Sequence, residues 1–159
     1  MKAVPGKTVT QRERRRIAQM AYMSITRGFQ GGSLEEIVAY YRAIVNHDQY
    51  YMLEQDNDVV AFCEFWKIKE QDIPRIKDFH RETLYPHGLN IFQEDGNVAY
   101  IAMFISEQSH DSLDLLMHFK RLIRKLKVKK VCWHKDNTKE FSEFYVRGDD
   151  NVEPKEAED

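Results

Sequence analysis

The segment from residue 97 to residue 135 constrains the fold more than any other part of the sequence. It contains the apolar run "NVAYIAMFIS", then "DSLDLLMHFKRLIRKLK", whose leucines recur at helical spacing, and then the apolar run "VKKVCWHK". Strand, helix and strand at this spacing form a βαβ unit. The sequence therefore predicts neighbouring parallel strands at 98–106 and 128–134, joined right-handedly by a helix near 112–127.

The N-terminal half predicts two helices followed by a hairpin. Apolar residues recur at helical spacing over residues 10–27, and Ser33 precedes a second amphipathic segment with Glu36 three positions later, which is the pattern of a capping box. The stretch "QYYMLEQDNDVVAFCEFWKI" is then two apolar runs separated by a polar turn. That pattern predicts two antiparallel strands.

The rest of the chain completes an α/β (α+β) fold with a mixed central sheet, N-terminal helices and a βαβ crossover. Residues 69–95 contain Pro and Gly and predict a short helix plus loop, and "FSEFYVR" predicts a last hairpin strand. We expect a single domain at 10–147, preceded by an arm at 1–9 and followed by an acidic, flexible tail at 148–159.

Composition excludes several classes of protein. The chain of 159 residues carries 24 basic and 26 acidic side chains, so no global field draws it to nucleic acid or anionic membranes. Cys63 and Cys132, the two cysteines, lie in apolar runs, which predicts buried thiols and no disulfide. No apolar run approaches the roughly 20 residues of a membrane span, so we expect a cytoplasmic protein.

The order of these elements resembles the GNAT superfamily of N-acyltransferases over residues 17–146. The hairpin stretch "DQYYMLEQDNDVVAFCEFWKI" is similar to one in the toxin-activating lysine acyltransferases, a GNAT-like group that takes acyl chains from acyl carrier protein. Size and the hairpin ending also resemble small phage-encoded GNAT-like proteins, some of which are packaged in virions. The resemblance implies a GNAT-like fold but leaves activity to be argued from individual residues.

The donor loop of typical GNAT enzymes, Gln/Arg-x-x-Gly-x-Gly/Ala, corresponds here to "QSHDSL". Gln108 fits the first position, and Ser109 and Ser112 are further candidates for contact with a cofactor. Asp111 and Leu113 replace the two small residues that allow close backbone approach. Acidic side chains around this point favour a plain helix start, capped by Asp111 or Ser109, over a pyrophosphate site.

The catalytic residues that the resemblance implies are not matched. The histidine and aspartate of the lysine acyltransferases fall near Gln19 and Ala102, and neither can act as a base. Glu64 occupies a strand where GNAT enzymes sometimes keep a general base, so it is a catalytic candidate. Strand alternation, however, favours an outward-facing, solvated Glu64.

His110, Asp114 and His118 follow one another at i, i+4 and i+8 on the helix near 112–127. Such a face could bind zinc, or Asp114 could orient His110 as a base. The alternative is a solvated face opposite the leucines. Because no fourth ligand occurs at motif spacing, the sequence predicts no metal site.

These observations lead to two interpretations of function. The first is a degenerate, non-catalytic GNAT-like protein with no cofactor, which acts through contacts with other protein chains as a phage virion or ejected component. The basic segment 12–16 and the acidic tail would serve those contacts, and nucleic-acid binding through the basic segments is a secondary interpretation. The alternative is an active N-acyltransferase with an unusual donor site, which uses acetyl-CoA, another acyl-CoA or acyl carrier protein.

Overall fold

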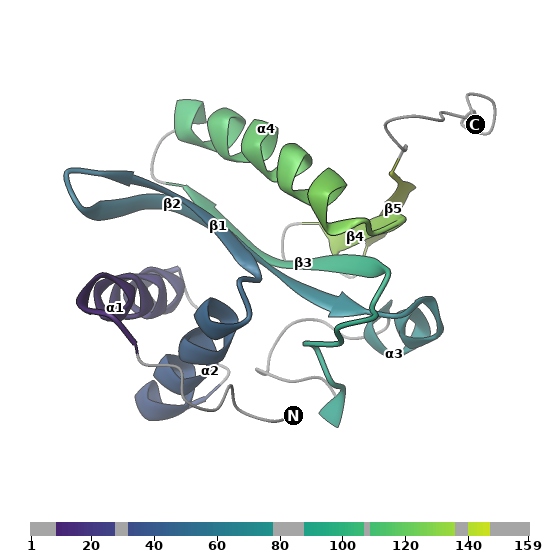
Figure 1. Cartoon of the computed structure of the whole chain (residues 1–159), viewed down its shortest axis with the longest axis horizontal. Coiled ribbons are helices and arrows are strands. Elements are labelled where there is room, and N and C mark those ends of the chain that lie inside the picture. The colour runs from purple at the N-terminus through teal and green to yellow at the C-terminus, as the bar shows by residue number, and fades with distance from the viewer. Residues whose placement is uncertain (1–8, 28–31, 78–87, 107–108, 136–139, 147–159) are drawn as a thin grey trace.

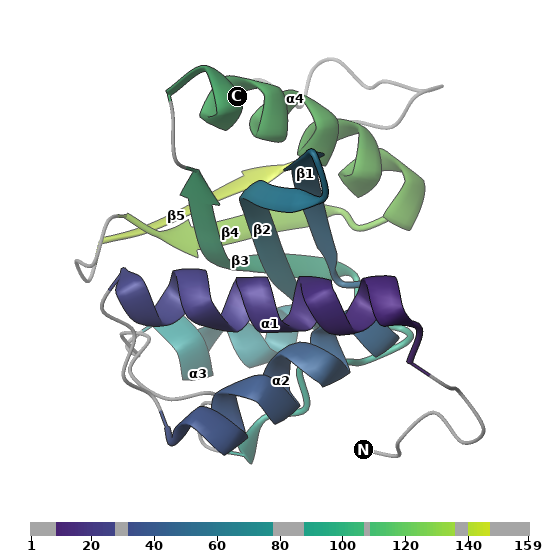
Figure 2. The same ribbon diagram turned by 90° about the vertical axis from the view of Figure 1, so that its left-hand side faces the viewer.

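A five-stranded mixed sheet lies between one long helix, α4, and a layer formed by α1, α2 and α3 (Figures 1 and 2). The computed structural model describes residues 9–27, 32–77, 88–106, 109–135 and 140–146. The helices are α1 (Gln11–Thr26), α2 (Leu34–Asn46), the 3-10 turn η1 (Glu70–Asp72), α3 (Ile73–Lys77) and α4 (Ser109–Leu126). The strands are β1 (Tyr50–Gln55), β2 (Asp58–Ile68), β3 (Val98–Ser106), β4 (Lys130–His134) and β5 (Phe141–Tyr145).

Both N-terminal helices begin with a capping box. The Ser33 hydroxyl accepts a 3.1 Å hydrogen bond from the Glu36 N–H, and the Glu36 carboxylate accepts one of 2.8 Å from the Ser33 N–H. This confirms the predicted start of α2. Thr10 and Glu13 make the same reciprocal pair of hydrogen bonds at the start of α1. In the sequence this capping box is visible as a Thr followed by a Glu three positions later.

The predicted hairpin is confirmed. β1 pairs antiparallel with β2, and the two residues between them, Asp56 and Asn57, both have positive φ (55° and 70°). Two left-handed residues in a two-residue loop match the twist of the flanking strands, and Asp and Asn tolerate that conformation better than most residues do.

The sheet order is β1-β2-β3-β4-β5, in which β3 and β4 are parallel and the other neighbours are antiparallel. Helix α4 joins β3 to β4, so the predicted strand–helix–strand unit is confirmed, as is the closing strand β5. Helix α4 begins at Ser109 and β4 at Lys130, whereas the sequence pattern predicted 112 and 128. No helix among the described residues is long and apolar enough to cross a membrane.

Apolar side chains pack on both faces of the sheet. Against α1 and α2 lie large residues including Phe62, Trp66 and Tyr100, and against α4 lie Phe65 and Val131 together with the buried face of the helix. Cys63 and Cys132 are buried free thiols, as predicted. Because helices cover both faces, β2 is buried along almost its whole length.

The basic segment 12–16, to which the sequence analysis assigned contacts with other chains, belongs to the first predicted helix. It forms the first turns of α1, where the Arg16 guanidinium donates hydrogen bonds of 3.0 and 3.1 Å to the Glu54 carboxylate on β1 and one of 2.9 Å to the Tyr50 hydroxyl. Arg12 also pairs with Glu54, at 3.1 Å. These arginines therefore attach α1 to the edge strand of the sheet. The acidic tail and residues 1–8 lie outside the described residues.

The variable segment predicted as short helix plus loop contains η1 and α3. Residues 78–87 lie outside the described part. Past them, Phe92 forms an isolated bridge with Lys67 of β2, and Gly96 lies so close to Ile68 that a Cβ there would be 2.8 Å from the Ile68 carbonyl oxygen. Only glycine fits at this crossing of two backbones.

Candidate functional site

Strands β3 and β4 separate partway along their length. They pair only at Val98 with Lys130, Ala99 with Val131 and Tyr100 with Cys132, although β3 continues to Ser106 and β4 to His134. Figure 2 shows the end of β3 rising away from β4 and β5 toward α4. We call this separation of the two strands beyond Tyr100 and Cys132 the β3/β4 gap.

A β-bulge in β3 lies at the start of the gap. Glu64 pairs with Met103 and Phe65 pairs with Ile101, so Ala102 is one extra residue of β3 in the register between these two pairs. A bulge of this kind bends its strand and increases the local twist. It accounts physically for the way in which β3 leaves β4.

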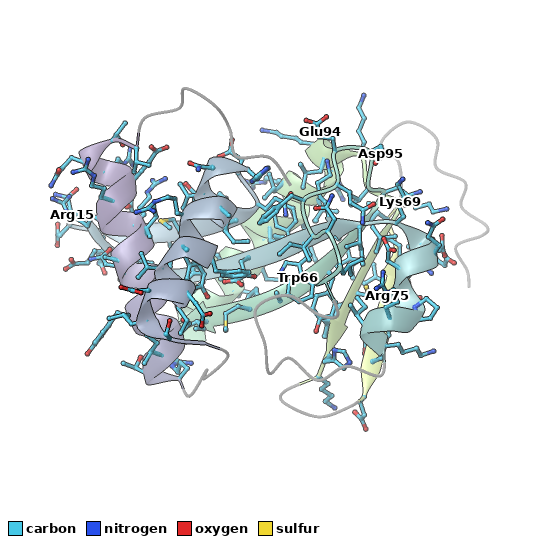
Figure 3. The ribbon with its side chains drawn as sticks, turned by 90° about the horizontal axis from the view of Figure 1, so that it is seen from below. Arg15, Trp66, Lys69, Arg75, Glu94 and Asp95 are labelled. Atoms are coloured by element: carbon cyan, nitrogen blue, oxygen red, sulfur yellow. The ribbon has the colours of Figure 1, made fainter. Side chains whose placement is uncertain are left out.

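Glu64 is fully buried, which corrects the prediction of a solvated side chain. Its exposed fraction is 0%, and its carboxylate accepts a 2.7 Å hydrogen bond from the Tyr40 hydroxyl of α2. The same hydroxyl accepts a 2.7 Å hydrogen bond from the Trp66 indole N–H. Seen from the side of α1 and α2, Trp66 lies near the middle of the sheet (Figure 3). The alternation argument failed because β2 has no solvent-facing side.

Tyr100 and His134 connect the two strands at the gap. The Tyr100 hydroxyl lies 2.7 Å from His134 Nδ1, and His134 Nε2 lies 3.1 Å from the Lys77 carbonyl oxygen at the end of α3. A carbonyl can only accept, so Nε2 carries a proton. When the imidazole is neutral, Nδ1 is then its basic nitrogen and accepts from the Tyr100 hydroxyl.

The sequence analysis did not single out Tyr100 or His134. A usable signal existed, because the parallel register that pairs Tyr100 with Cys132 puts His134, two residues further on, on the same face of the sheet. That register, however, is set by contacts between distant segments, and the sequence pattern alone does not determine which residues of β3 and β4 lie opposite each other.

A cation that the sequence analysis also missed, Arg27, lies at the mouth of the gap, by which we mean the end of β3 at Ser106. Arg27, at the C-terminal end of α1, donates a 2.6 Å hydrogen bond to the backbone carbonyl of Ser106, the last residue of β3. Its guanidinium is therefore held where β3 leads into α4. A cation at this place suits an anionic group at the mouth of the gap.

The predicted donor loop is only partly described. Gln108 lies outside the described residues, and of Ser109 and Ser112 the structure gives the helical backbone but not the side chains. Helix α4 starts at Ser109 and Asp111 lies in its first turn, so neither residue precedes the helix as the predicted cap. The acidic first turn itself is as expected and favours the helix through its dipole.

The face with His110, Asp114 and His118 is helical, as predicted. Asp114 is exposed, whereas His118 is half-buried and stacks on Tyr51 of β1 with ring centroids 5.2 Å apart. The side chain of His110 is not described. Among the described residues, no three His, Cys, Asp or Glu side chains gather as a metal site would require.

Gln19 and Ala102, where the lysine acyltransferases have their histidine and aspartate, have structural roles. The Gln19 side chain donates a 3.1 Å hydrogen bond to Asp58 and accepts one of 3.0 Å from the Val59 N–H, which ties α1 to the start of β2. Ala102 forms the bulge. Neither side chain can act as a general base.

Comparison with known proteins shows that the fold is GNAT-like. The structure is similar to the loading GNATL domain of CurA from Lyngbya majuscula, with a TM-score of 0.55 and 18% identity, over 80% of this chain and 62% of that one. The chain thus spans less than two thirds of the domain it matches.

Two further structures align over most of this chain. One is described as an acetyltransferase (TM-score 0.47, 15% identity, 82% of this chain and 79% of that one). The other is N-acetylglutamate synthase from Neisseria gonorrhoeae complexed with coenzyme A and N-acetyl-glutamate (TM-score 0.44, 15% identity, 80% and 24%). No family model and no curated sequence matches the chain.

Proposed function

We propose that the chain is an N-acyltransferase that takes an acyl group from a thioester and transfers it to an amine. The observation that carries this proposal is the β3/β4 gap, where pairing stops at Tyr100 and Cys132 while both strands continue. Strands that separate from each other no longer share a hydrogen-bond ladder there. An extended donor arm with its own amide groups can enter such a separation in the manner of an added strand.

The transfer needs a proton acceptor beside the gap. The amine nitrogen attacks the thioester carbonyl, a C–N bond forms, the C–S bond breaks, and the nitrogen loses a proton while the sulfur leaves as a thiol. Glu64 is fully buried and bonded to Tyr40, whereas His134 lies at the end of β4 with a basic nitrogen bonded to Tyr100. We assign the acceptance of the proton that the amine nitrogen loses to the Tyr100–His134 pair. Glu64 instead fixes β2 against α2.

The residues at the mouth of the gap fit an acyl donor whose phosphate groups make few contacts with the protein. Arg27 offers a cation at Ser106, but the first turn of α4 carries Asp111, and Leu113 is 62% exposed at a position where GNAT enzymes keep a small residue. A carboxylate at this helix end opposes a pyrophosphate. We therefore expect acetyl-CoA to bind less well than a donor that is bound mainly through its extended, amide-containing arm.

A titration with S-acetyl-pantetheine and with acetyl-CoA tests the proposal. We expect amide chemical shifts of residues 101–106 to move and those of 98–100, which stay paired, to move little. Linkage predicts a stabilisation of about 2.7 kcal/mol at a hundredfold excess over Kd. His134→Asn should bind the donor as before and lose turnover, with amine acylation followed by mass spectrometry. No shift and no stabilisation with either thioester would refute the proposal.

The second candidate function is a non-catalytic protein that contacts other chains, such as those of a phage particle. Asp111 and Leu113 in place of small residues favour it, because they remove the usual pyrophosphate contact. The same titration separates the two candidates, since the non-catalytic protein binds neither thioester.

A further inference from the structure

The C-terminal half of α4 and the turn after it carry a cluster of cations. Residues 115–127 contain no Asp or Glu. Five exposed basic residues lie in this stretch, namely Lys120, Arg121, Arg124, Lys125 and Lys127. Within the described part of the chain, no carboxylate forms a salt bridge with any of the five. We call these five residues the α4 cations.

The α4 cations lie away from the sheet, because the inward face of the helix is filled by apolar side chains that pack on the strands. Lys120 precedes Arg124 by four residues, and Arg121 precedes Lys125 by four, so the cations form two adjacent rows along the helix. Like charges at this spacing repel one another. The outward side of α4 therefore suits an occupant that brings several carboxylates.

The acidic tail, residues 148–159, has the complementary charge. Its sequence, "GDDNVEPKEAED", contains six carboxylates and one lysine, which gives a formal charge of -5. The whole chain has a net charge of only -2. The tail and the α4 cations are thus two opposite local concentrations of charge in an almost neutral chain.

The chain leaves the described fold beside the α4 cations. Val146, just before the tail, packs against the same apolar cluster as Leu122 and Leu126 of α4. Its N–H donates a 2.9 Å hydrogen bond to the carbonyl oxygen of Lys129, three residues after the helix ends. Figure 1 shows β5 next to the end of α4 that leads into β4. The tail therefore starts on the α4 side of the sheet, at the basic end of the helix.

Length and tethering also favour contact between the two. Twelve residues of extended chain span up to about 40 Å, whereas the 18 residues of α4 make a helix about 27 Å long. Exposed ion pairs are individually weak. A tethered segment, however, meets its site at a high effective concentration. A separate acidic protein lacks this advantage.

We propose that the acidic tail binds along the outward side of α4, with its carboxylates on the α4 cations, and covers this side of the helix against other polyanions. The inference goes beyond the proposed function and does not depend on it. It also differs from the interpretation in which the tail contacts other chains, because the binding site for the tail lies on the same molecule.

A spin label on the tail tests where the tail lies. Ala157→Cys in the full chain supplies the attachment site, and the label attaches selectively because Cys63 and Cys132 are buried. Broadening of backbone amide NMR signals reports which residues the label approaches. We expect broadening of residues 117–127 and none of residues 11–20 on α1, which lies across the sheet from α4 (Figure 2). Added salt should remove the broadening.

Charge reversal on the helix tests whether the α4 cations hold the tail. Lys120→Glu/Arg124→Glu should remove most of the broadening on α4, because repulsion replaces attraction. Arg121→Glu/Lys125→Glu, on the adjacent row, should act in the same direction.

The matched control is Arg14→Glu/Arg15→Glu, which reverses two exposed cations on α1 and should leave the broadening of α4 unchanged. An equal effect of the control and the α4 variants would overturn the proposed site, as would similar broadening of α1 and α4. Broadening that grows with protein concentration would also overturn it, because the tail would then lie on another molecule.

Chromatography on heparin from low salt tests whether the tail covers the helix. Glu153→Gln/Glu156→Gln removes two charges of the tail, and Glu35→Gln/Glu94→Gln removes two exposed carboxylates elsewhere. We expect the tail variant to elute at higher salt than the unmodified chain and the control, because its uncovered cations reach the polyanion. Adding the first α4 charge reversal should abolish the difference. Elution of the tail variant together with the control would overturn the proposal.

Discussion

The Tyr40 hydroxyl donates a 2.7 Å hydrogen bond to the Glu64 carboxylate, and both side chains are fully buried between α2 and the sheet. The same oxygen accepts from the Trp66 indole at 2.7 Å. One phenol therefore satisfies a buried acceptor and a buried donor at once, on two different residues of β2. Buried polar groups left without a partner are costly, so this hydroxyl fixes how α2 lies on the sheet.

Tyr40→Phe removes that hydroxyl and keeps the ring. We expect the free energy of unfolding to fall by about 1–3 kcal/mol, because the Glu64 carboxylate and the Trp66 N–H each lose the hydrogen bond to this hydroxyl. Urea denaturation measures the change. Tyr22→Phe, at a tyrosine that is 70% exposed on α1, is the control and should change stability by less than about 0.5 kcal/mol. Equal stability of Tyr40→Phe and the unmodified protein would show that Tyr40 acts through its ring alone.

Gly96→Ala should destabilise the protein through a backbone clash. The added Cβ would lie 2.8 Å from the Ile68 carbonyl oxygen and 2.9 Å from the Ile68 nitrogen, and neither atom can swing aside as a side chain can. We expect a loss of about 1–3 kcal/mol in thermal or urea unfolding. Gly88→Asn is the control, because among the described residues, its chain neighbours aside, no atom lies within 4 Å of a Cβ there, and Asn tolerates its φ of +71°. A Gly96→Ala protein as stable as the control would mean that the segment before β3 shifts freely.

Local sequence signals predicted the elements well because their causes are local. The capping box at Ser33 and the polar turn between β1 and β2 are each decided within a few residues, and the structure confirms both. The strand–helix–strand order similarly required β3 and β4 to be parallel neighbours. The order of these elements is what resembles the GNAT superfamily.

The site depends on contacts between distant segments, and there the sequence analysis was weaker. Glu64 was expected to face solvent because alternate strand residues usually do, but α1 and α2 cover one face of β2 and α4 covers the other. The separation of β3 from β4 depends on a bulge at Ala102, and one extra residue leaves no trace in an apolar run. Tyr100 and His134 meet only because of the register that this arrangement produces.

The two cysteines should be unreactive in the folded protein. Burial raises the pKa of the Cys132 thiol to about 12, and burial also raises the pKa of Cys63 above its ordinary value. Since the thiolate is the reactive form, we expect almost no alkylation by iodoacetamide at neutral pH in the native state. Both thiols should react readily in concentrated guanidinium chloride. Fast labelling of one thiol without denaturant would reveal local opening of β2 or β4.

The contact between α1 and β1 should make stability depend on pH through Glu54. Hydrogen bonds from Arg16, against some opposing burial and with help from Arg12, hold the pKa of the Glu54 carboxyl below its ordinary value. A carboxyl with a depressed folded-state pKa stabilises the fold above its unfolded pKa, near 4.3, and that stabilisation is lost as the pH falls through the folded pKa.

Arg16→Gln should therefore lower the free energy of unfolding by about 1 kcal/mol at pH 7, and the difference from the unmodified protein should shrink as the pH falls below about 4. Urea unfolding at a series of pH values measures the effect. Arg15→Gln is the matched control, since Arg15 lies exposed on the same helix and at the outer edge of the molecule in Figure 3. It should leave the pH profile unchanged. A constant difference between Arg16→Gln and the unmodified protein at every pH would mean that Arg16 stabilises α1 by packing on Tyr50, whose ring centroid is 6.0 Å from the guanidinium carbon, and not by its charge.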